Sequence, residues 1–159
     1  MSAVVVPCCV RLRPMRAADL PTVMEIETSA YPFPWTLQVF KDCLRVGYNA
    51  SVLERDDSII GYGIISMGAG KAHILNLCVH PSLQRRGYGQ RILQHLLAFA
   101  KQKGVQSVFL EVRTSHKAAI NLYDKTGFNE VGVRKKYYPN GNKGQEDGLI
   151  FAIELSTTD

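Results

Sequence analysis

The chain has 159 residues, which allows one domain with a substantial core and is short for two domains. Apolar residues make up 46% and charged residues 21%, a composition that excludes a disordered chain and predicts one globular domain over residues 1–159. The net charge of +5 predicts an anionic partner, such as a phosphate-rich cofactor, nucleic acid or an acidic protein.

The first half of the chain predicts two short helices and an antiparallel meander. Residues 10–13 are typical of a strand, and Asp19 is placed to cap a helix that continues to about Ser29. Two prolines make residues 31–35 an irregular aromatic loop, after which Thr36 can cap a second helix. Short turns separate three further strands, which we expect at residues 51–55, 59–67 and 72–79.

The second half alternates strands and helices, which favours parallel pairing and a sheet covered on both faces. Apolar residues from Ile92 onward recur at helical spacing until Gly104. Ser115 is placed to cap another helix, which Gly127 ends. Strands are expected at residues 107–112, 128–133 and 148–155, with a polar loop at 139–144. The fold class that follows is a mixed α/β sheet.

The cysteines and the apolar segments indicate the compartment. Cys8, Cys9, Cys43 and Cys78 lack the spacing of zinc or redox pairs, so we expect reduced thiols and no metal site. No basic segment precedes the short apolar run at residues 4–6, and no stretch reaches the about 18 apolar residues of a membrane span. These features predict a cytoplasmic protein without a signal peptide or a membrane partner.

Residues 84–90, Gln-Arg-Arg-Gly-Tyr-Gly-Gln, lie where an apolar strand passes into a helix. The first turn of a helix has unpaired backbone NH groups and the positive end of the helix dipole, and it therefore attracts phosphate. Gly87 and Gly89 leave those groups uncovered, and Arg85 and Arg86 add positive charge. The turn is therefore suited to a pyrophosphate.

Two common nucleotide-binding loops are excluded here. A dinucleotide fingerprint would require a glycine in place of Ile92, and a P-loop at Gly70-Lys71 would require Ser or Thr in place of Ala72. On these residues alone, a glycine turn with solvated arginines remains the alternative.

Five segments in order resemble the GNAT superfamily of N-acetyltransferases, which is marked by a Q/R-x-x-G-x-G/A turn followed by a helix. The segments are Leu-Asn-Leu-Cys-Val-His-Pro at 75–81, Gln-Arg-Arg-Gly-Tyr-Gly at 84–89, Leu-Glu-Val-Arg at 110–113, Ala-Ala-Ile-Asn-Leu-Tyr at 118–123 and Gly-Phe at 127–128. The resemblance implies a central, mostly antiparallel sheet that is splayed at an acetyl-CoA site and flanked by helices.

Three local features resemble the bacterial branch of this superfamily that acetylates ribosomal proteins. They are Phe-Pro-Trp at 33–35, Leu-Glu-Val-Arg at 110–113, and Tyr-Tyr-Pro at 137–139 followed by Glu-Asp at 146–147. The resemblance implies an acetyl-CoA-dependent N-terminal protein acetyltransferase. Its substrate would be the α-amine of an N-terminal alanine, in a small-subunit ribosomal protein. This amine would attack the thioester of acetyl-CoA directly in a ternary complex.

The resemblance also implies how acetyl-CoA would be held. The backbone of one strand would pair with the pantetheine arm as though it were an added strand, and the NH groups of the turn would hold the pyrophosphate. His116 stands where the family has an asparagine, and Gln90 where a basic residue is frequent. The implied cofactor-binding residues are Leu77, Cys78, Val79, Arg85, Arg86, Gly87, Tyr88, Gly89, Gln90 and His116.

Acetyl transfer to a peptide amine requires a base and an acid, because an α-amine with a pKa of about 7.7 to 8.0 is mostly protonated at pH 7. The resemblance assigns Glu111 as the base and Tyr123 as the acid. The strand pattern supports Glu111 independently, because its apolar neighbours Leu110 and Val112 share the opposite face. Without the resemblance, Glu111 would read as an ion-paired carboxylate and Tyr123 as a core aromatic.

The same resemblance places substrate recognition at the edges of the fold. We expect an aromatic wall and an aromatic closure around the peptide, and a carboxylate that attracts a basic residue after the acetylated one. Loop anchoring and solvated turn charges are the plainer alternatives for these side chains. The residues are Phe33 and Trp35 for the wall, Tyr137 and Tyr138 for the closure, and Glu146 or Asp147 for the charge.

Three other functions remain open on the sequence. One is acetylation of lysine or of a small amine by the same fold, and another is a non-catalytic acyl-CoA sensor. An RNA-binding protein fits the charge, but no nucleic-acid motif is present, so we expect no direct nucleic-acid binding. The expected partner is a protein or peptide N-terminus.

Overall fold

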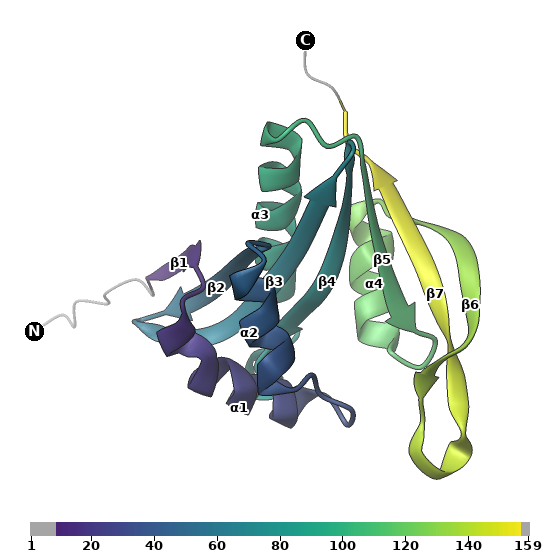
Figure 1. The fold of residues 1–159 in the computed structure, drawn as a ribbon, viewed down its shortest axis with the longest axis horizontal. Coiled ribbons are helices and arrows are strands. Elements are labelled where there is room, and N and C mark those ends of the chain that lie inside the picture. The colour runs from purple at the N-terminus through teal and green to yellow at the C-terminus, as the bar shows by residue number, and fades with distance from the viewer. Residues whose placement is uncertain (1–8, 157–159) are drawn as a thin grey trace, which may run out of the picture.

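The computed structural model describes residues 9–156, and Cys8 and the apolar run at 4–6 lie outside them. One sheet has the strand order β1-β2-β3-β4-β5-β7-β6, with α1 and α2 over one face and α3 and α4 over the other (Figure 1). The strands are β1 (Val10–Pro14), β2 (Asn49–Arg55), β3 (Ser58–Gly68), β4 (Lys71–Val79), β5 (Ser107–Arg113), β6 (Asn129–Pro139) and β7 (Gln145–Glu154). The helices are α1 (Leu20–Ala30), α2 (Leu37–Arg45), α3 (Tyr88–Gln102) and α4 (Lys117–Thr126), with 3-10 turns at Ala17–Asp19, Pro81–Leu83 and Gly141–Lys143. The expected mixed α/β sheet is confirmed.

Strand pairing in this sheet is parallel only between β4 and β5. The predicted meander from β2 to β4 is confirmed, and each strand begins one or two residues earlier than expected. The expectation of parallel pairing in the second half is wrong beyond β5. A short connection joins β6 to β7 as a hairpin, and the strands of a hairpin run antiparallel.

β4 and β5 pair over three residue pairs only, the last being His73 with Phe109. Both strands continue past this point, to Val79 and Arg113, but they diverge (Figure 1). Leu75 is the extra residue of a bulge in β4 against β3, and a bulge bends its strand. The sheet is therefore splayed, with one edge of β4 left open.

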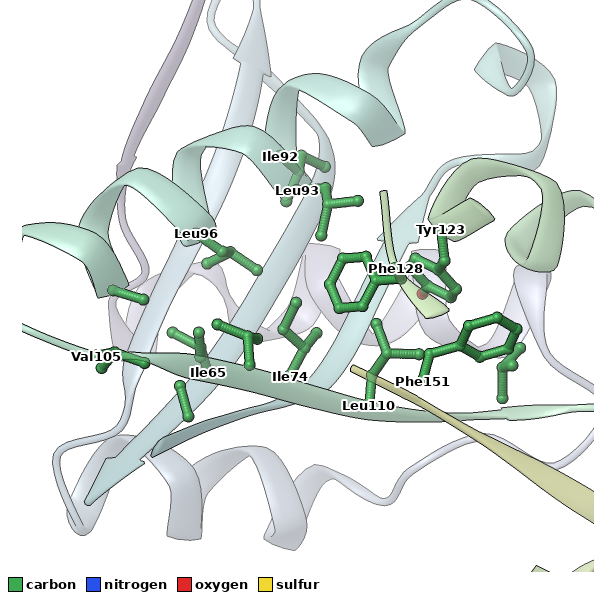
Figure 2. Packing of buried hydrophobic residues seen from close by; sticks show 14 of the residues in the cluster. Ile65, Ile74, Ile92, Leu93, Leu96, Val105, Leu110, Tyr123, Phe128 and Phe151 are labelled. Atoms are coloured by element: carbon green, nitrogen blue, oxygen red, sulfur yellow. The ribbon is translucent and has the colours of Figure 1, made fainter. Parts of the chain in front are cut away.

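Two apolar cores cover the two faces of the sheet. The α3 and α4 side is drawn in Figure 2, where Ile92, Leu93 and Leu96 point at the sheet and are fully buried. Gly63 on β3 lets α3 approach, because a Cβ at that position would lie 2.8 Å from both Ile92 and Leu96. This contact fixes α3, and with it the turn at its N-terminus. The other core joins α1 and α2 to β2 and β3.

Of the three side chains predicted to cap helices, one does so. Thr36 caps α2, since its hydroxyl accepts the backbone NH of Val39. Ser115 does not cap α4, because its hydroxyl bonds to Glu146 on β7. Asp19 precedes α1 but does not cap it either, since its carboxylate turns back to Arg13. Both exceptions arise because a distant partner competes for the side chain.

The structure describes three of the four cysteines and all of the helices named above. Cys9, Cys43 and Cys78 are free thiols. Within residues 9–156, no helix combines the length and the apolar character needed to cross a membrane.

Arg13 on β1 binds two carboxylates, that of Asp19 just before α1 and that of Glu54 on β2. Its guanidinium donates to both oxygens of Asp19 at 2.8 Å and also to Glu54. These hydrogen bonds hold the pKa of both carboxyl groups below the ordinary value. Stabilisation from a depressed pKa is complete above the unfolded value of about 4 and is lost as the pH falls through the folded value.

We therefore expect the unfolding free energy to decrease from about pH 5 downward, and less steeply in Asp19→Asn than in the wild type. Urea denaturation at several pH values measures this slope. Asp42→Asn removes an exposed carboxylate of α2 and is the control that should keep the wild-type slope. Equal slopes in all three proteins would contradict the prediction.

Candidate active site

Two cavities lie along the opening between β4 and β5. The first has a volume of about 590 Å³ and is bounded by the end of β4, the turn before α3, and α4. The second has a volume of about 520 Å³ and lies between β4, β5 and the loop that follows α1. The residues that line both are Ala30, Tyr31, Leu77, His116 and Tyr123. Ligands held in the two cavities would therefore meet beside Tyr123.

The open edge of β4 borders the first cavity. The carbonyl of Leu77 accepts the hydroxyl of Tyr31 at 2.8 Å, and the carbonyl of Val79 accepts the Gln84 amide at 3.1 Å. Both carbonyls face away from β3, and the NH of a strand residue points to the same side as its carbonyl. Leu77 and Val79 therefore present their NH groups to the cavity, whereas the backbone of Cys78, which alternates with them, faces β3.

The turn before α3 leaves backbone donors free. Gly87 is the N-cap of α3 with φ +86°, and no side chain caps this helix. The first helical hydrogen bond runs from the NH of Arg91 to the carbonyl of Gly87. The NH groups of residues 88–90 therefore have no intrahelical acceptor, and the positive end of the helix dipole lies with them.

Most of the predicted cofactor residues gather at this cavity. Those that line it are Leu77, Cys78, Val79, Arg85, Gly87, Gly89, Gln90 and His116, whereas Arg86 and Tyr88 line neither cavity. Burial, and then the positive charge of Arg113, lower the pKa of His116. Neutral His116 therefore predominates at neutral pH and adds no positive charge to the cavity.

Glu111 lies on β5, and its side chain is on the face opposite Leu110 and Val112, as predicted. It lines the second cavity and is 10% exposed. Its Oε1 accepts the Nε of Arg134 at 3.1 Å, and its Oε2 contacts the Nε2 of His73. The carboxylate is thus held by two partners and still borders the space where a substrate amine could lie.

Tyr123 lies in α4 and packs with Phe128 and Phe151, at ring-centre distances of 5.8 and 6.3 Å (Figure 2). Burial, and then the nearby Tyr138, raise the pKa of its phenol well above 10. Among the described residues, none is hydrogen-bonded to its hydroxyl, and the side chain lines both cavities. A buried, protonated phenol without a partner is a donor available to a ligand.

The aromatic loop after α1 forms one wall of the second cavity. Trp35 is anchored by its backbone NH, which donates to Glu27 at 2.8 Å. The guanidinium of Arg113 lies 5.0 Å from the ring centre of Phe33 and 4.6 Å from that of Tyr138. This stack joins the loop to β6 across the end of β5. Phe33, Trp35 and Tyr138 all line the second cavity.

The remaining predicted substrate residues are engaged within the protein. Glu146 lines the second cavity, but it is paired with Arg113 at 2.9 Å. Burial opposes its ionisation, yet the hydrogen bonds from Arg113 and Ser115 hold its pKa below the ordinary value. Asp147 accepts the backbone NH of Lys136 at 2.9 Å and lines neither cavity. A basic substrate side chain would therefore have to exchange with Arg113 to reach Glu146.

Tyr137 also lines neither cavity. The residue is 49% exposed, and its ring packs edge-on against Tyr138, with the ring centres 4.8 Å apart. The register of β6 against β7 is irregular between Arg134 and Tyr138, so the two rings lie side by side, and of the two only Tyr138 lines the second cavity.

Glu27 is a cavity residue that the sequence reasoning missed. It is 1% exposed and accepts the hydroxyl of Tyr62 at 2.5 Å and the amide of Asn76 at 3.0 Å, in addition to the Trp35 NH. A signal was present, because Glu27 follows Val23 by four residues on the apolar face of α1. Tyr31, His73 and Arg134 were missed as well, and their roles depend on contacts that are distant in sequence.

The sequence of this chain is similar to those of known acetyltransferases. The family model described as Acetyltransferase (GNAT) family matches residues 20–128. The chain is 37% identical over 142 residues to the [ribosomal protein bS18]-alanine N-acetyltransferase of Salmonella typhimurium, which covers 89% of this chain and 95% of that protein. The Haemophilus influenzae protein of the same name is 36% identical over 141 residues, covering 89% and 96%.

The solved structures include a close likeness of the whole fold. The crystal structure of the ribosomal-protein-S18-alanine N-acetyltransferase from Escherichia coli matches with a TM-score of 0.88 and 33% identity. The match covers 95% of this chain and 97% of that one. The chain therefore belongs to the GNAT family of acetyltransferases and has the fold of that family.

Proposed function

We propose that this enzyme transfers an acetyl group from acetyl-CoA to the α-amine of an N-terminal alanine, in a small-subunit ribosomal protein of the bS18 type. The observation that carries the proposal is the meeting of two cavities at Tyr123, one bordered by a helix N-terminus and the other by Glu111. The names of the relatives at 36 and 37% identity support the choice of substrate.

The first cavity has the features that acetyl-CoA requires. The free NH groups of residues 88–90 suit a pyrophosphate, and a Cβ added at Gly87 would project into open space beside them. The NH groups of Leu77 and Val79 suit the amide carbonyls of the pantetheine arm, as in strand addition. Arg85 lines the same cavity and adds a positive charge.

The second cavity has the groups that amine acetylation requires. Acetyl-CoA supplies a thioester whose carbonyl carbon the amine attacks. Glu111 removes a proton from the α-ammonium, which predominates at pH 7 because its pKa is about 7.7 to 8.0. The raised pKa of Tyr123 keeps its phenol protonated, and it donates this proton to the departing thiolate. The phenolate that remains takes up the second proton that the nitrogen loses as the amide forms. Direct attack in a ternary complex leaves the buried Cys78 with an apolar packing role only.

The glycine at the start of α3 provides a matched test of the acetyl-CoA site. Gly87 and Gly104 both have positive φ, +86° and +79°, and a Cβ at either position would meet nothing within 4 Å. Alanine should therefore cost each about 1 kcal/mol of stability through backbone strain. Only Gly87→Ala should also weaken CoA binding in calorimetry, by about tenfold or more, because its Cβ crowds the free NH groups. Equal affinities in the two variants would contradict this placement of the pyrophosphate.

The substrate is tested with two peptides analysed by mass spectrometry after incubation with acetyl-CoA and enzyme. One begins Ala-Arg with a free α-amine, and the other has a blocked α-amine and a free lysine. We expect an acetyl group only on the free alanine terminus. Acetylation of the lysine instead would overturn the proposed substrate, and acetylation of neither peptide, with CoA binding intact, would favour an acyl-CoA sensor.

A further inference from the structure

His73 lies at the point where β4 and β5 separate, and it contacts the candidate base. Its Nε2 contacts Oε2 of Glu111, while Arg134 occupies Oε1 at 3.1 Å. Glu111 is 10% exposed and lines the second cavity, whereas His73 is 38% exposed and lines neither cavity. His73 therefore reaches the carboxylate from outside the substrate space and exchanges protons with solvent independently of the substrate.

We propose that His73 is a positioning residue that couples proton uptake by Glu111 to its own protonation state. This proposal rests on the proposed function, in which Glu111 is the base. Neutral His73 donates its Nε2–H to one carboxylate oxygen and holds the group against the cavity wall. The N–H bond of the substrate ammonium then breaks, an O–H bond forms on Glu111, and water removes that proton after the product leaves.

The charges around Glu111 explain why protonation of His73 would oppose the reaction. The guanidinium of Arg134 is a cation, so the ion pair that it forms with Glu111 has no net charge. A proton on His73 makes the cluster +1, which stabilises the ionised carboxylate against proton uptake and repels an approaching ammonium.

The other groups around His73 are two uncharged side chains, a lysine and a tyrosine. Its cross-strand partners are Ser66 on β3 and Phe109 on β5, and neither carries a charge. Lys71 lies two residues earlier on the same face of β4. Burial, then Tyr137 and Glu111, raise the pKa of Tyr138 to about 12, so its phenol stays neutral.

The coupling can be measured without any turnover, by NMR titration of the histidine rings. In Glu111→Gln, the titration midpoint of His73 should fall by about 1 pH unit or more, because a favourable negative charge is lost and Arg134 remains. His73→Gln identifies the signals. His95 on α3, which contacts Ser51 at 3.3 Å, is the internal control whose midpoint should not move. An unchanged His73 midpoint would overturn the proposal.

The effect on catalysis is measured by the pH dependence of kcat/KM. His73→Gln keeps an NH donor but cannot be protonated. On the acid limb, the slope of log(kcat/KM) against pH should therefore decrease by about one, while KM for the peptide is unchanged. His73→Ala should lower kcat about tenfold across the range, and His95→Gln should match the wild type. A wild-type acid limb in His73→Gln would refute the coupling. If the wild type acetylates nothing, the proposed function fails, and the NMR midpoint still decides whether the two groups are coupled.

Discussion

Replacing Glu111 with Gln is expected to lower kcat for N-terminal acetylation by about 10²- to 10⁴-fold. Gln has nearly the same shape and can still contact Arg134, but it cannot accept a proton from the substrate ammonium. KM for acetyl-CoA should stay close to the wild-type value, because Glu111 lines the second cavity and not the first. Initial rates at varied peptide and acetyl-CoA concentrations measure both parameters.

The pH dependence of the same variant adds a second readout. The residual rate of Glu111→Gln should rise with pH, since the α-amine then loses its proton to solvent without help. Glu130→Gln changes an exposed carboxylate on β6 and is the control that should retain full activity. A Glu111→Gln rate within threefold of the wild type would show that another group is the base.

Replacing Glu27 with Ala should lower the unfolding free energy by about 3 to 5 kcal/mol. The buried carboxylate accepts hydrogen bonds from Tyr62, Asn76 and the backbone NH of Trp35. Ala would leave all three donors without an acceptor and open a cavity in the α1 core. A loss of this size is large against the 5 to 15 kcal/mol by which domains are usually stable.

The loss is measured by urea denaturation, with Glu25→Ala as the matched control. Glu25 is exposed on the same helix, so its replacement should change stability by less than about 0.5 kcal/mol. Glu27→Ala should also raise KM for the peptide, because Trp35 loses the anchor that holds it at the cavity wall. A stability loss below about 1 kcal/mol would contradict the role assigned to Glu27.

Local features of the chain were predicted well. The stripe of Ile92, Leu93 and Leu96 follows the helical period, and all three side chains are buried on one face of α3. Thr36 caps α2 because its partner, Val39, is three residues away in the chain. Such interactions depend on neighbours that the sequence itself brings together, so the pattern of residues is sufficient to find them.

Long-range competition explains the predictions that were wrong. Asp19 and Ser115 have the right chemistry for helix caps, but Arg13 and Glu146 engage their side chains instead. At both positions, a partner from another element takes the side chain in place of the local backbone NH. The direction of β7 has a different cause, because its hairpin with β6 makes the two strands antiparallel.

The candidate site divides in the same way. The glycines of the turn and the tyrosine of α4 belong to short segments whose order resembles the family. The sequence by itself determined the fold class and singled out the turn before α3, which borders the first cavity. Only the tertiary structure decided the partners of the charged groups. Glu111 is held by His73 and Arg134, which are 38 and 23 residues away, and Glu146 is taken by Arg113. The physical reason is that ion pairs form between whichever charges the packed sheet and helices bring within reach, and spacing along the chain does not encode that proximity.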